Sequence, residues 1–376
     1  MKTDFAPFLA WSQAKGISTP LELVSNGSYR YMALPASKDY LMSQSKSPNL
    51  INVMTAPLDS CIVGEDWETL VEKLNYEKAK GPDSDFGPWL DLFPTLEDFE
   101  GMPRFWKPER RELVRQYDSG QLEARMEIDR LRFNQVDDQW ALAVVDSRSN
   151  FLPDNTYSMT PLLDMFNHKS NVKTSARVDG ANQLLLEVDS RSILEEGDET
   201  KSRDWANQLF GVFSGGATNY KAGAEVYVSY GNFDNMETLC NYGFVEKENV
   251  SNVETFRVRL MGKGPAYLVV GSDGSIDSMI NQLSLTDFRL ALASPAEIES
   301  LDENNWDGIG KISERNDIEV FALIAGELEE ALYDAKNGAD EAKAMGDDLV
   351  TSYLRGRQNT LEKGRNGLKA KYPDVF

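Results

Sequence analysis

The sequence predicts an α+β protein in which strand segments and helical segments occupy different parts of the chain. Alternating β-branched and aromatic residues indicate strands at 21–33, 183–188 and 225–230. Apolar residues at helical spacing begin near Trp67 and dominate the chain from Ser284 onward. Because 41% of the 376 residues are hydrophobic and seven are tryptophan, the chain can bury one large core with an appended domain, or two to three small cores.

Composition limits the partners. A net charge of −22 repels nucleic acid and anionic membranes and attracts basic proteins, although the acidity could equally serve solubility. The two cysteines, Cys61 and Cys240, are too few for a zinc cluster or a disulfide framework, so we expect no metal site and a reducing compartment. No apolar run is long enough to predict a membrane span, and the polar first sixteen residues predict neither a secretory signal nor a transit peptide.

The first third of the chain predicts a helix, a hairpin and a second helix. The first helix ends near Gly16, and Asn26-Gly27 supplies the turn between two strands at 21–33. The second helix begins near Trp67. The apolar faces of the two helices are Phe5, Phe8, Leu9 and Trp11, then Leu70, Val71, Leu74 and Tyr76.

Aromatic anchors and further helices follow. The segments 87–94 and 104–106 are rich in aromatic residues and predict core anchors within loops. A charged, amphipathic helix is expected from Pro108 through Arg132. The apolar run around Trp140 predicts another helix within 133–151.

The stretch 223–245 predicts a strand followed by a short helix. The strand stops at Tyr230, where Gly231 and Asn232 favour a turn. The helix is expected to end near Tyr242, because Gly243 suits a left-handed C-cap. Two tyrosines therefore lie at the two ends of one strand–helix unit.

A second unusual string, Thr160-Pro-Leu-Leu-Asp-Met-Phe-Asn-His168, contains the only histidine of the protein. In this order, 163–168, 225–231 and 241–245 resemble the SET-domain methyltransferases, and within them the Rubisco large-subunit methyltransferase-like branch. Trp140-Ala141 followed by Ser147-Arg148, and the aromatic strings at 87–94 and 104–106, are similar to the same branch.

The resemblance implies a domain organisation. It predicts a β-rich, pseudoknotted SET core, a helical insert and a mainly helical C-terminal lobe that helps to hold the protein substrate. The N-terminal part of the core would span 1–66, the insert 67–142, the C-terminal part of the core 143–248 and the substrate-binding lobe 249–376. The stretch 194–216 is an insertion relative to the family pattern, and we expect it to form a surface hairpin or loop.

The resemblance also implies a methyl donor, S-adenosylmethionine, and the residues that bind it. Asn167 and His168 would bind its adenosine and methionine parts, and Ser147 and Arg148 would line its amino-acid moiety, for which a guanidinium is a suitable partner. Asp164 and Tyr230 complete the cofactor-binding set. From the residues alone, a lone histidine is more often a core residue than a ligand.

The same resemblance makes Tyr230 the catalytic residue and places Tyr242 and Phe244 along the substrate-binding tunnel. Methyl transfer from a sulfonium to an amine is an in-line displacement that needs a neutral amine, alignment and exclusion of water. A phenolic oxygen beside the methyl group favours the transition state, and a desolvated lysine loses its proton more easily. The alternative is that both tyrosines are ordinary core aromatics.

One departure from the family pattern bears on the donor. The family has a Gly-x-Gly loop two residues before an alanine, whereas Ser28, Tyr29 and Arg30 stand before Ala33 here. Glycine lets backbone approach a ligand closely. We expect the backbone here to border the donor pocket with Tyr29 or Arg30 turned outward, whereas a side chain filling the pocket would favour a non-catalytic scaffold.

The predicted function is methylation of a lysine, or of a histidine, on a non-histone protein with a basic segment. The alternatives are a catalytically inactive scaffold that binds a basic protein and an unrelated function on a similar fold. We expect a monomer that binds neither nucleic acid nor membrane, in the cytoplasm, with the nucleus or a plastid as alternatives.

Overall fold

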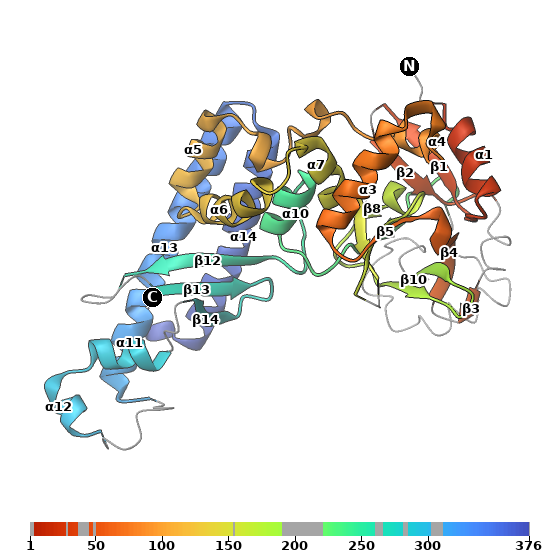
Figure 1. The fold of residues 1–376 in the computed structure, drawn as a ribbon. Helices are drawn as coiled ribbons and strands as arrows, with labels where there is room; N and C mark the ends of the chain where they lie inside the picture. The colour runs from red at the N-terminus through yellow and green to blue at the C-terminus, as the bar shows by residue number, and fades with distance from the viewer. Residues whose placement is uncertain are drawn as a thin grey trace. The chain divides into compact units, whose positions relative to one another are not determined.

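The computed structural model separates into two compact units (Figure 1). The N-terminal unit comprises Met1–Asp98 and Gln135–Asn232, and the C-terminal unit comprises Phe99–Asn134 and Phe233–Phe376. The four finer segments expected from the sequence stay a prediction. The structure describes residues 4–27, 29–36, 45–47, 50–152, 155–189, 221–259, 266–280, 285–301 and 311–375, so the expected insertion at 194–216 lies outside the described residues.

The N-terminal unit begins with helix α1 (Ala6–Ala14) and a hairpin of β1 (Glu22–Asn26) and β2 (Tyr29–Ala33). Asn26 pairs with Tyr29, and Gly27 has a φ of 67°, a conformation that glycine adopts without strain. The predicted hairpin is confirmed, but its turn begins at Gly27 rather than at Asn26, because Asn26 still belongs to β1.

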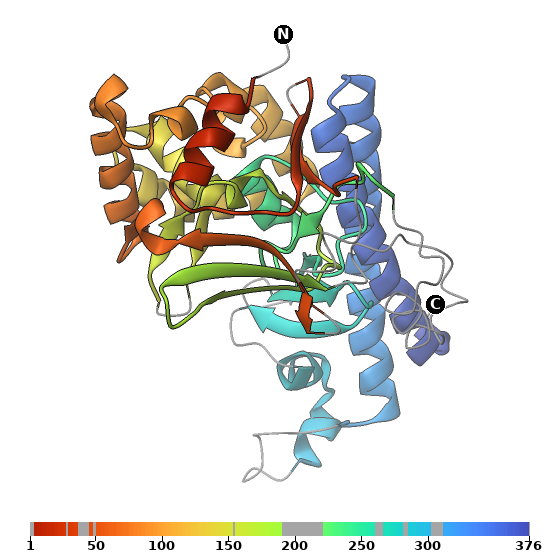
Figure 2. The ribbon, with the colours of Figure 1, turned by 90° about the vertical axis from the view of Figure 1, so that its right-hand side faces the viewer.

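A four-stranded antiparallel sheet forms the largest β layer of this unit, in the order β3-β4-β10-β9 (Figure 2). Its strands are β3 (Ser45–Ser47), β4 (Leu50–Pro57), β9 (Thr174–Val178) and β10 (Gln183–Asp189). The predicted strand at 183–188 is confirmed, and β10 is buried from its second residue to its last. A bulge between Leu186 and Glu187 interrupts its register with β4.

Two smaller sheets lie nearer the residues predicted to be functional. The first has the order β5-β7-β6, and the second pairs β8 with β11 in parallel. Their bounds are β5 (Ile62–Gly64), β6 (Ser149–Phe151), β7 (Tyr157–Met159), β8 (Asn167–His168) and β11 (Tyr227–Val228).

The strand predicted at 225–230 is therefore too long, because only Tyr227 and Val228 form a ladder. Beyond Val228, side chains take the place of a neighbouring strand as hydrogen-bond acceptors for the backbone. The Ser229 N–H donates to Thr174 Oγ1 at 2.8 Å, and the Tyr230 N–H donates to His168 Nδ1 at 3.0 Å. The backbone thus leaves the sheet at the predicted catalytic tyrosine.

Helices α3 (Trp67–Ala79), α4 (Gly87–Leu90) and α7 (Gln139–Arg148) complete the N-terminal unit. The Asp66 and Asp138 carboxylates accept hydrogen bonds from the first turns of α3 and α7, which fixes where each helix begins. Residues 141–145 of α7 are buried in full, so this helix anchors the unit.

Short 3₁₀ helices occur in both units. Those of the N-terminal unit are η1 (Leu58–Ser60), η2 (Gly81–Asp83) and η5 (Leu163–Met165). Those of the C-terminal unit are η4 (Pro103–Phe105) and η7 (Pro373–Val375), and η3 (Glu97–Phe99) lies at the boundary between the units in the sequence.

In the C-terminal unit, the single helix expected from Pro108 through Arg132 is wrong. The structure has α5 (Pro108–Tyr117) and α6 (Gln121–Phe133), separated by Ser119 and Gly120 with φ values of 61° and 76°. The Asp118 carboxylate accepts hydrogen bonds from the N–H groups of Gly120 and Leu122, which satisfies the start of α6.

Two long helices, α13 (Glu314–Ala344) and α14 (Asp348–Lys371), lie side by side (Figure 1, Figure 2). A meander of β12 (Val253–Val258), β13 (Ala266–Gly271) and β14 (Ile276–Ile280) packs against them. The helical periodicity predicted beyond Ser284 is confirmed. The shared core includes Phe256, Leu268, Val270, Leu328 and Leu361.

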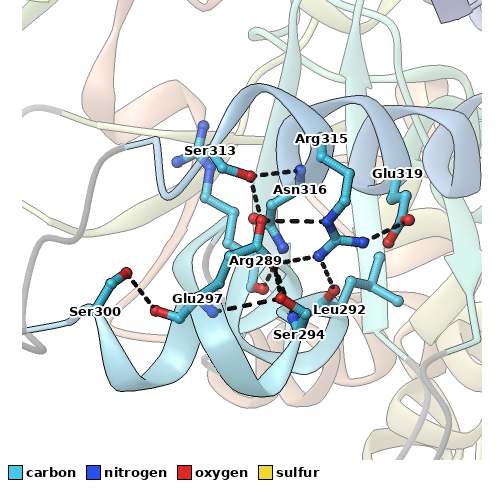
Figure 3. A network of polar contacts seen from close by, with 9 residues as sticks. All are labelled: Arg289, Leu292, Ser294, Glu297, Ser300, Ser313, Arg315, Asn316 and Glu319. Atoms are coloured by element: carbon cyan, nitrogen blue, oxygen red, sulfur yellow. Dashed lines mark hydrogen bonds and ion pairs between the residues drawn. The ribbon is translucent and has the colours of Figure 1, made fainter.

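A polar junction joins α11 (Leu285–Leu292), α12 (Pro295–Glu299) and the start of α13 (Figure 3). Ser294 caps α12, and Glu297 returns the bond to the Ser294 N–H in a capping box. The same carboxylate accepts hydrogen bonds from Ser313 Oγ and Arg315 Nη2. Ser313 in turn caps α13. One glutamate therefore ties two helix starts together.

The α+β prediction is confirmed: the small sheets group in the N-terminal unit and one meander, and the long helices lie at the C-terminal end. Within the described ranges, no helix is both long and apolar enough to span a bilayer.

Candidate functional site

An ion pair between a partly buried arginine and a buried aspartate lies at the end of α7. Arg148, the last residue of that helix, donates from Nη1 to Asp164 Oδ2 at 2.9 Å and to the Asp164 carbonyl at 3.1 Å. Trp89 Nε1 donates to the same Oδ2 at 3.1 Å. The Asp164 side chain is 0% exposed. Burial raises the pKa of Asp164, and the charge of Arg148 opposes that rise.

This pair leaves polar atoms unused. Arg148 Nε and Asp164 Oδ1 are buried and have no hydrogen-bond partner among the described residues. Each such atom costs about 1–3 kcal/mol unless something fills its bonding capacity. A free amino acid carries a carboxylate and an ammonium, the two groups that a guanidinium and a carboxylate bind.

The backbone before Asp164 is unusual as well. Leu162, which precedes the η5 turn, has a φ of 68°. A bulky residue rarely adopts this conformation, and strained residues of this kind concentrate at functional sites. The surrounding structure holds Leu162 there, because its side chain is only 2% exposed.

Arg30 reaches the same place from strand β2. Its Nη1 donates to the carbonyl of Leu92, and the side chain is partly buried. Burial, and then the charge of Arg148, lower the pKa of Arg30, whereas Asp164 acts in the opposite direction. Tyr29 is 48% exposed. Tyr29 or Arg30 was expected to turn outward: Tyr29 is the more exposed of the two, and Arg30 is partly buried within electrostatic range of the ion pair. Ser28 lies outside the described residues.

Asn167 is held by Glu225, a residue that the sequence did not single out. Asn167 Nδ2 donates to Glu225 Oε1 at 2.6 Å and to the Arg30 carbonyl at 2.9 Å. The hydroxyls of Tyr29 and Tyr227 donate to the two Glu225 oxygens, each at 2.8 Å. The sequence signal that could have identified Glu225 was the alternation at 225–230, which placed this residue on the same predicted strand as Tyr227. Three donors around one carboxylate fix the orientation of Asn167.

Tyr230 and His168 form one unit with the loop before them. The Tyr230 hydroxyl donates to the Phe166 carbonyl at 2.6 Å, and the two rings are 5.1 Å apart between centroids. Burial lowers the pKa of His168 to about 4, so the imidazole is neutral at pH 7. Because Nδ1 accepts the Tyr230 N–H bond, the proton of this neutral ring is on Nε2. Burial also raises the pKa of Tyr230, which keeps the phenol protonated.

Ser147 lies one residue before Arg148, but its hydroxyl donates back to the Ala143 carbonyl of α7 at 2.8 Å. Its contact with a donor stays a prediction. The N-terminal unit therefore brings together Arg148, Asp164, Asn167, His168 and Tyr230, with Arg30 and Glu225 as additions. No cluster of metal-ligating side chains occurs in the part of the chain that the structure describes.

Tyr242 and Phe244 lie in the C-terminal unit at the end of α10 (Asn235–Tyr242). The predicted left-handed cap is confirmed, since Gly243 has a φ of 76°. A Cβ on Gly101 would lie 2.6 Å from the Gly243 carbonyl oxygen, so glycine is required at position 101. The ring of Phe233, which the sequence did not single out, lies 6.0 Å from the Tyr242 ring between centroids, and the Phe244 ring lies at the same distance. Their role along a substrate tunnel stays a prediction.

The chain has the SET-domain fold, as solved structures show. Relevant neighbours include the SET domain of LSMT bound to methyllysine and AdoHcy, with a TM-score of 0.62 and 16% identity, over 100% of this chain and 94% of that chain. Rubisco LSMT bound to AdoMet has a TM-score of 0.57 and 15% identity, over 100% and 93%. At these identities the likeness is one of fold, and the predicted SET fold is confirmed.

Among curated proteins, the Protein SET DOMAIN GROUP 40 of Arabidopsis thaliana is 28% identical over 162 residues, or 39% of this chain. The match spans about a third of that protein's length, 32%. No protein-family model matches the chain.

Proposed function

We propose that this protein is an S-adenosylmethionine-dependent methyltransferase that modifies a lysine side chain of a non-histone protein. The observation that carries the proposal is the Arg148–Asp164 pair, whose buried Nε and Oδ1 atoms have no partner among the described residues. The SET fold supports it, because the similar LSMT structures contain AdoMet or AdoHcy, and lysine or methyllysine in some cases.

The residues of the N-terminal unit fit the donor. Arg148 would bind its carboxylate and Asp164 its ammonium group, since these are complementary charges. Asn167 and His168 would hold the remainder. The donor supplies a methyl group on a positively charged sulfur. A neutral His168 and a protonated Tyr230 add no charge that would compete with the donor's own groups.

Tyr230 would act on the reacting centre. Its hydroxyl is fixed by the bond to Phe166, so the phenolic oxygen has a set position. A preorganised dipole of this kind favours a transition state in which the methyl group carries positive charge.

The substrate is proposed to be a protein with a basic segment. The net charge of −22 attracts such a partner over long range and raises its rate of encounter. An amine must be neutral to accept a methyl group, and an aromatic surface such as that of Phe233, Tyr242 and Phe244 desolvates it. Histidine is the second acceptor that this chemistry admits.

A non-catalytic scaffold is the second candidate, and Arg30 is the observation that favours it. An arginine stands where the related pattern has glycine, and its side chain approaches the ion pair. A scaffold would bind a basic protein but not the donor.

Donor binding followed by transfer tests the proposal. Calorimetric titration with AdoHcy is expected to show one site. Incubation of the protein and radiolabelled AdoMet with an extract of cells that lack this protein is expected to label specific bands, which mass spectrometry would assign to methyllysine. The matched control is Tyr230→Phe, which should bind AdoHcy and label the bands weakly. Absence of AdoHcy binding would overturn the proposal in favour of the scaffold.

A further inference from the structure

We propose that Arg30 is a donor-binding residue: its guanidinium, together with that of Arg148, forms a two-arginine site for the carboxylate of the donor's amino-acid moiety. This inference rests on the proposed function. In the family pattern, a glycine loop lets the backbone approach the donor closely. Here the charge of Arg30 would recognise the donor directly instead.

The main chain of Arg30 is fixed. Strand β2 contacts the η5 turn that carries Asp164. The Arg30 carbonyl accepts the Asn167 Nδ2 bond at 2.9 Å, and Asn167 is held in turn by Glu225. The side chain therefore starts from a defined position beside the predicted donor-binding residues.

One short segment contacts all three charged groups. Trp89 donates to Asp164, the Leu92 carbonyl accepts from Arg30, and the Phe93 ring lies 5.6 Å from the Arg148 guanidinium carbon. Residues 89–93 thus contact Arg30, Arg148 and Asp164, which places the three charged groups near one another. An arginine that merely covered the surface would not need this support.

The charges of Arg30, Arg148 and Asp164 do not balance. Two guanidiniums lie within electrostatic range of one buried carboxylate, and the positive charge of Arg148 disfavours the charged form of Arg30. Asp98 also acts on Arg30, but that carboxylate is exposed and bonded to Thr95, so solvent screens it. A second positive charge beside a partly buried pair costs free energy unless an anion binds there.

The hydrogen-bonding capacity of Arg30 agrees with this role. A guanidinium carries five N–H groups in a fixed fork, and the bond to Leu92 uses one of them. Arg148 has a buried Nε that no described residue bonds. Two forks with capacity to spare suit the two oxygens of one carboxylate.

The test compares two ligands that differ only in the amino-acid moiety. AdoHcy has the carboxylate, whereas 5′-methylthioadenosine has the adenosine and the thioether without it. By calorimetry, Arg30→Met should weaken AdoHcy about tenfold to a hundredfold and leave 5′-methylthioadenosine within about twofold. Arg177→Met, which removes the exposed arginine of the pair with the buried Glu187 in the same unit, is the control and should change neither affinity. Melting temperatures of both variants would verify folding.

The outcomes separate the possibilities. If Arg30→Met or Arg30→Gly binds AdoHcy as well as or better than the wild type, Arg30 obstructs the site or is irrelevant, and the inference is overturned while donor binding stands. Equal weakening of both ligands would also overturn it, because the effect would then not involve the carboxylate. If neither the wild type nor any variant binds AdoHcy, the proposed function fails and the inference fails with it.

Discussion

Glu297 and Asp164 each pair with an arginine, but the two carboxylates differ in how completely they are hydrogen-bonded. Glu297, at the junction of α12 and α13, accepts hydrogen bonds from Ser294, Ser313 and Arg315 and has no acceptor capacity to spare (Figure 3). Asp164, beside Arg148, accepts through Oδ2 alone, and its buried Oδ1 has no partner among the described residues.

The pKa shifts of the two groups follow from this difference. Hydrogen bonds, first of all from Arg315, lower the pKa of Glu297. Burial raises the pKa of Asp164 despite the neighbouring Arg148. A carboxylate whose bonds are complete stabilises structure, whereas an incompletely bonded one carries a desolvation cost that a further hydrogen-bond partner, such as a ligand or a water molecule, offsets. Incomplete bonding therefore distinguishes the Asp164 pair from the Glu297 pair.

The largest expected effect concerns turnover. Tyr230→Phe should lower the rate of methyl transfer about 10²–10³-fold, because one preorganised polar group is lost from a dry site. The folding cost is expected to be about 1–2 kcal/mol rather than negligible, since the Phe166 carbonyl loses its 2.6 Å partner. Single-turnover kinetics at saturating donor measure the first quantity and chemical denaturation the second.

Tyr117→Phe is the matched control for that experiment. It removes a hydroxyl that donates to Glu341 at 2.7 Å in the C-terminal unit. It should leave single-turnover rates unchanged. Equal rates for Tyr230→Phe and the wild type would exclude a catalytic role for Tyr230.

The next effect concerns donor affinity. Arg148→Met removes the arginine of the incompletely bonded pair, and AdoHcy should bind about tenfold to a hundredfold more weakly, as expected for loss of a charge-assisted hydrogen bond. Arg315→Met removes the arginine of the completely bonded pair and should lower the melting temperature without changing AdoHcy affinity. If both variants weaken AdoHcy equally, the distinction between the two pairs is wrong.

The fold could be predicted well where local signals agree. The Gly243 cap and the helical periodicity around Leu328 lie where expected, and the hairpin turn begins one residue later than expected, at Gly27. The break between α5 and α6 was missed because the charged, amphipathic pattern continues on both sides of it, although Asp118-Ser119-Gly120 is typical of a turn and Ser119 and Gly120 take a positive φ. The strand at Tyr230 was overextended because side chains of Thr174 and His168, distant in sequence, replace its ladder.

The candidate site was predicted in its residues but not in its bonding. The strings around Asp164 and Tyr230 identified the groups that the N-terminal unit brings together. Glu225 was missed because its role depends on Asn167, which is 58 positions away in sequence. The inward direction of Arg30 depends on the Leu92 carbonyl, 62 positions away, so no local pattern encodes it.

A smaller effect is expected in the pH dependence of stability. The pKa of His168 is lowered from 6.5 to about 4, so the unfolded chain binds the extra proton first as the pH falls. The contribution of His168 is therefore complete above pH 6.5 and is lost on acidification toward about pH 4, by up to roughly 1.4 kcal/mol per pH unit. His168→Gln, which keeps an acceptor for the Tyr230 N–H, should flatten that part of the curve. Parallel curves for the two proteins from pH 7 to 4 would contradict the buried, neutral state.

The smallest effect is expected at Glu297, where the bonding is complete. Glu297→Gln keeps the size of the side chain and one acceptor oxygen but no longer balances the charge of Arg315, so the starts of α12 and α13 should exchange their amide hydrogens faster. Because the pKa of Glu297 is lowered from 4.5, the stabilisation that it gives is present above that pH and is lost as the pH falls further. The wild type and the variant should therefore converge in melting temperature under acid and differ near pH 7. AdoHcy affinity should not change at either pH. A loss of affinity as large as that of Arg148→Met would show that complete bonding does not separate structural carboxylates from ligand-binding ones in this protein.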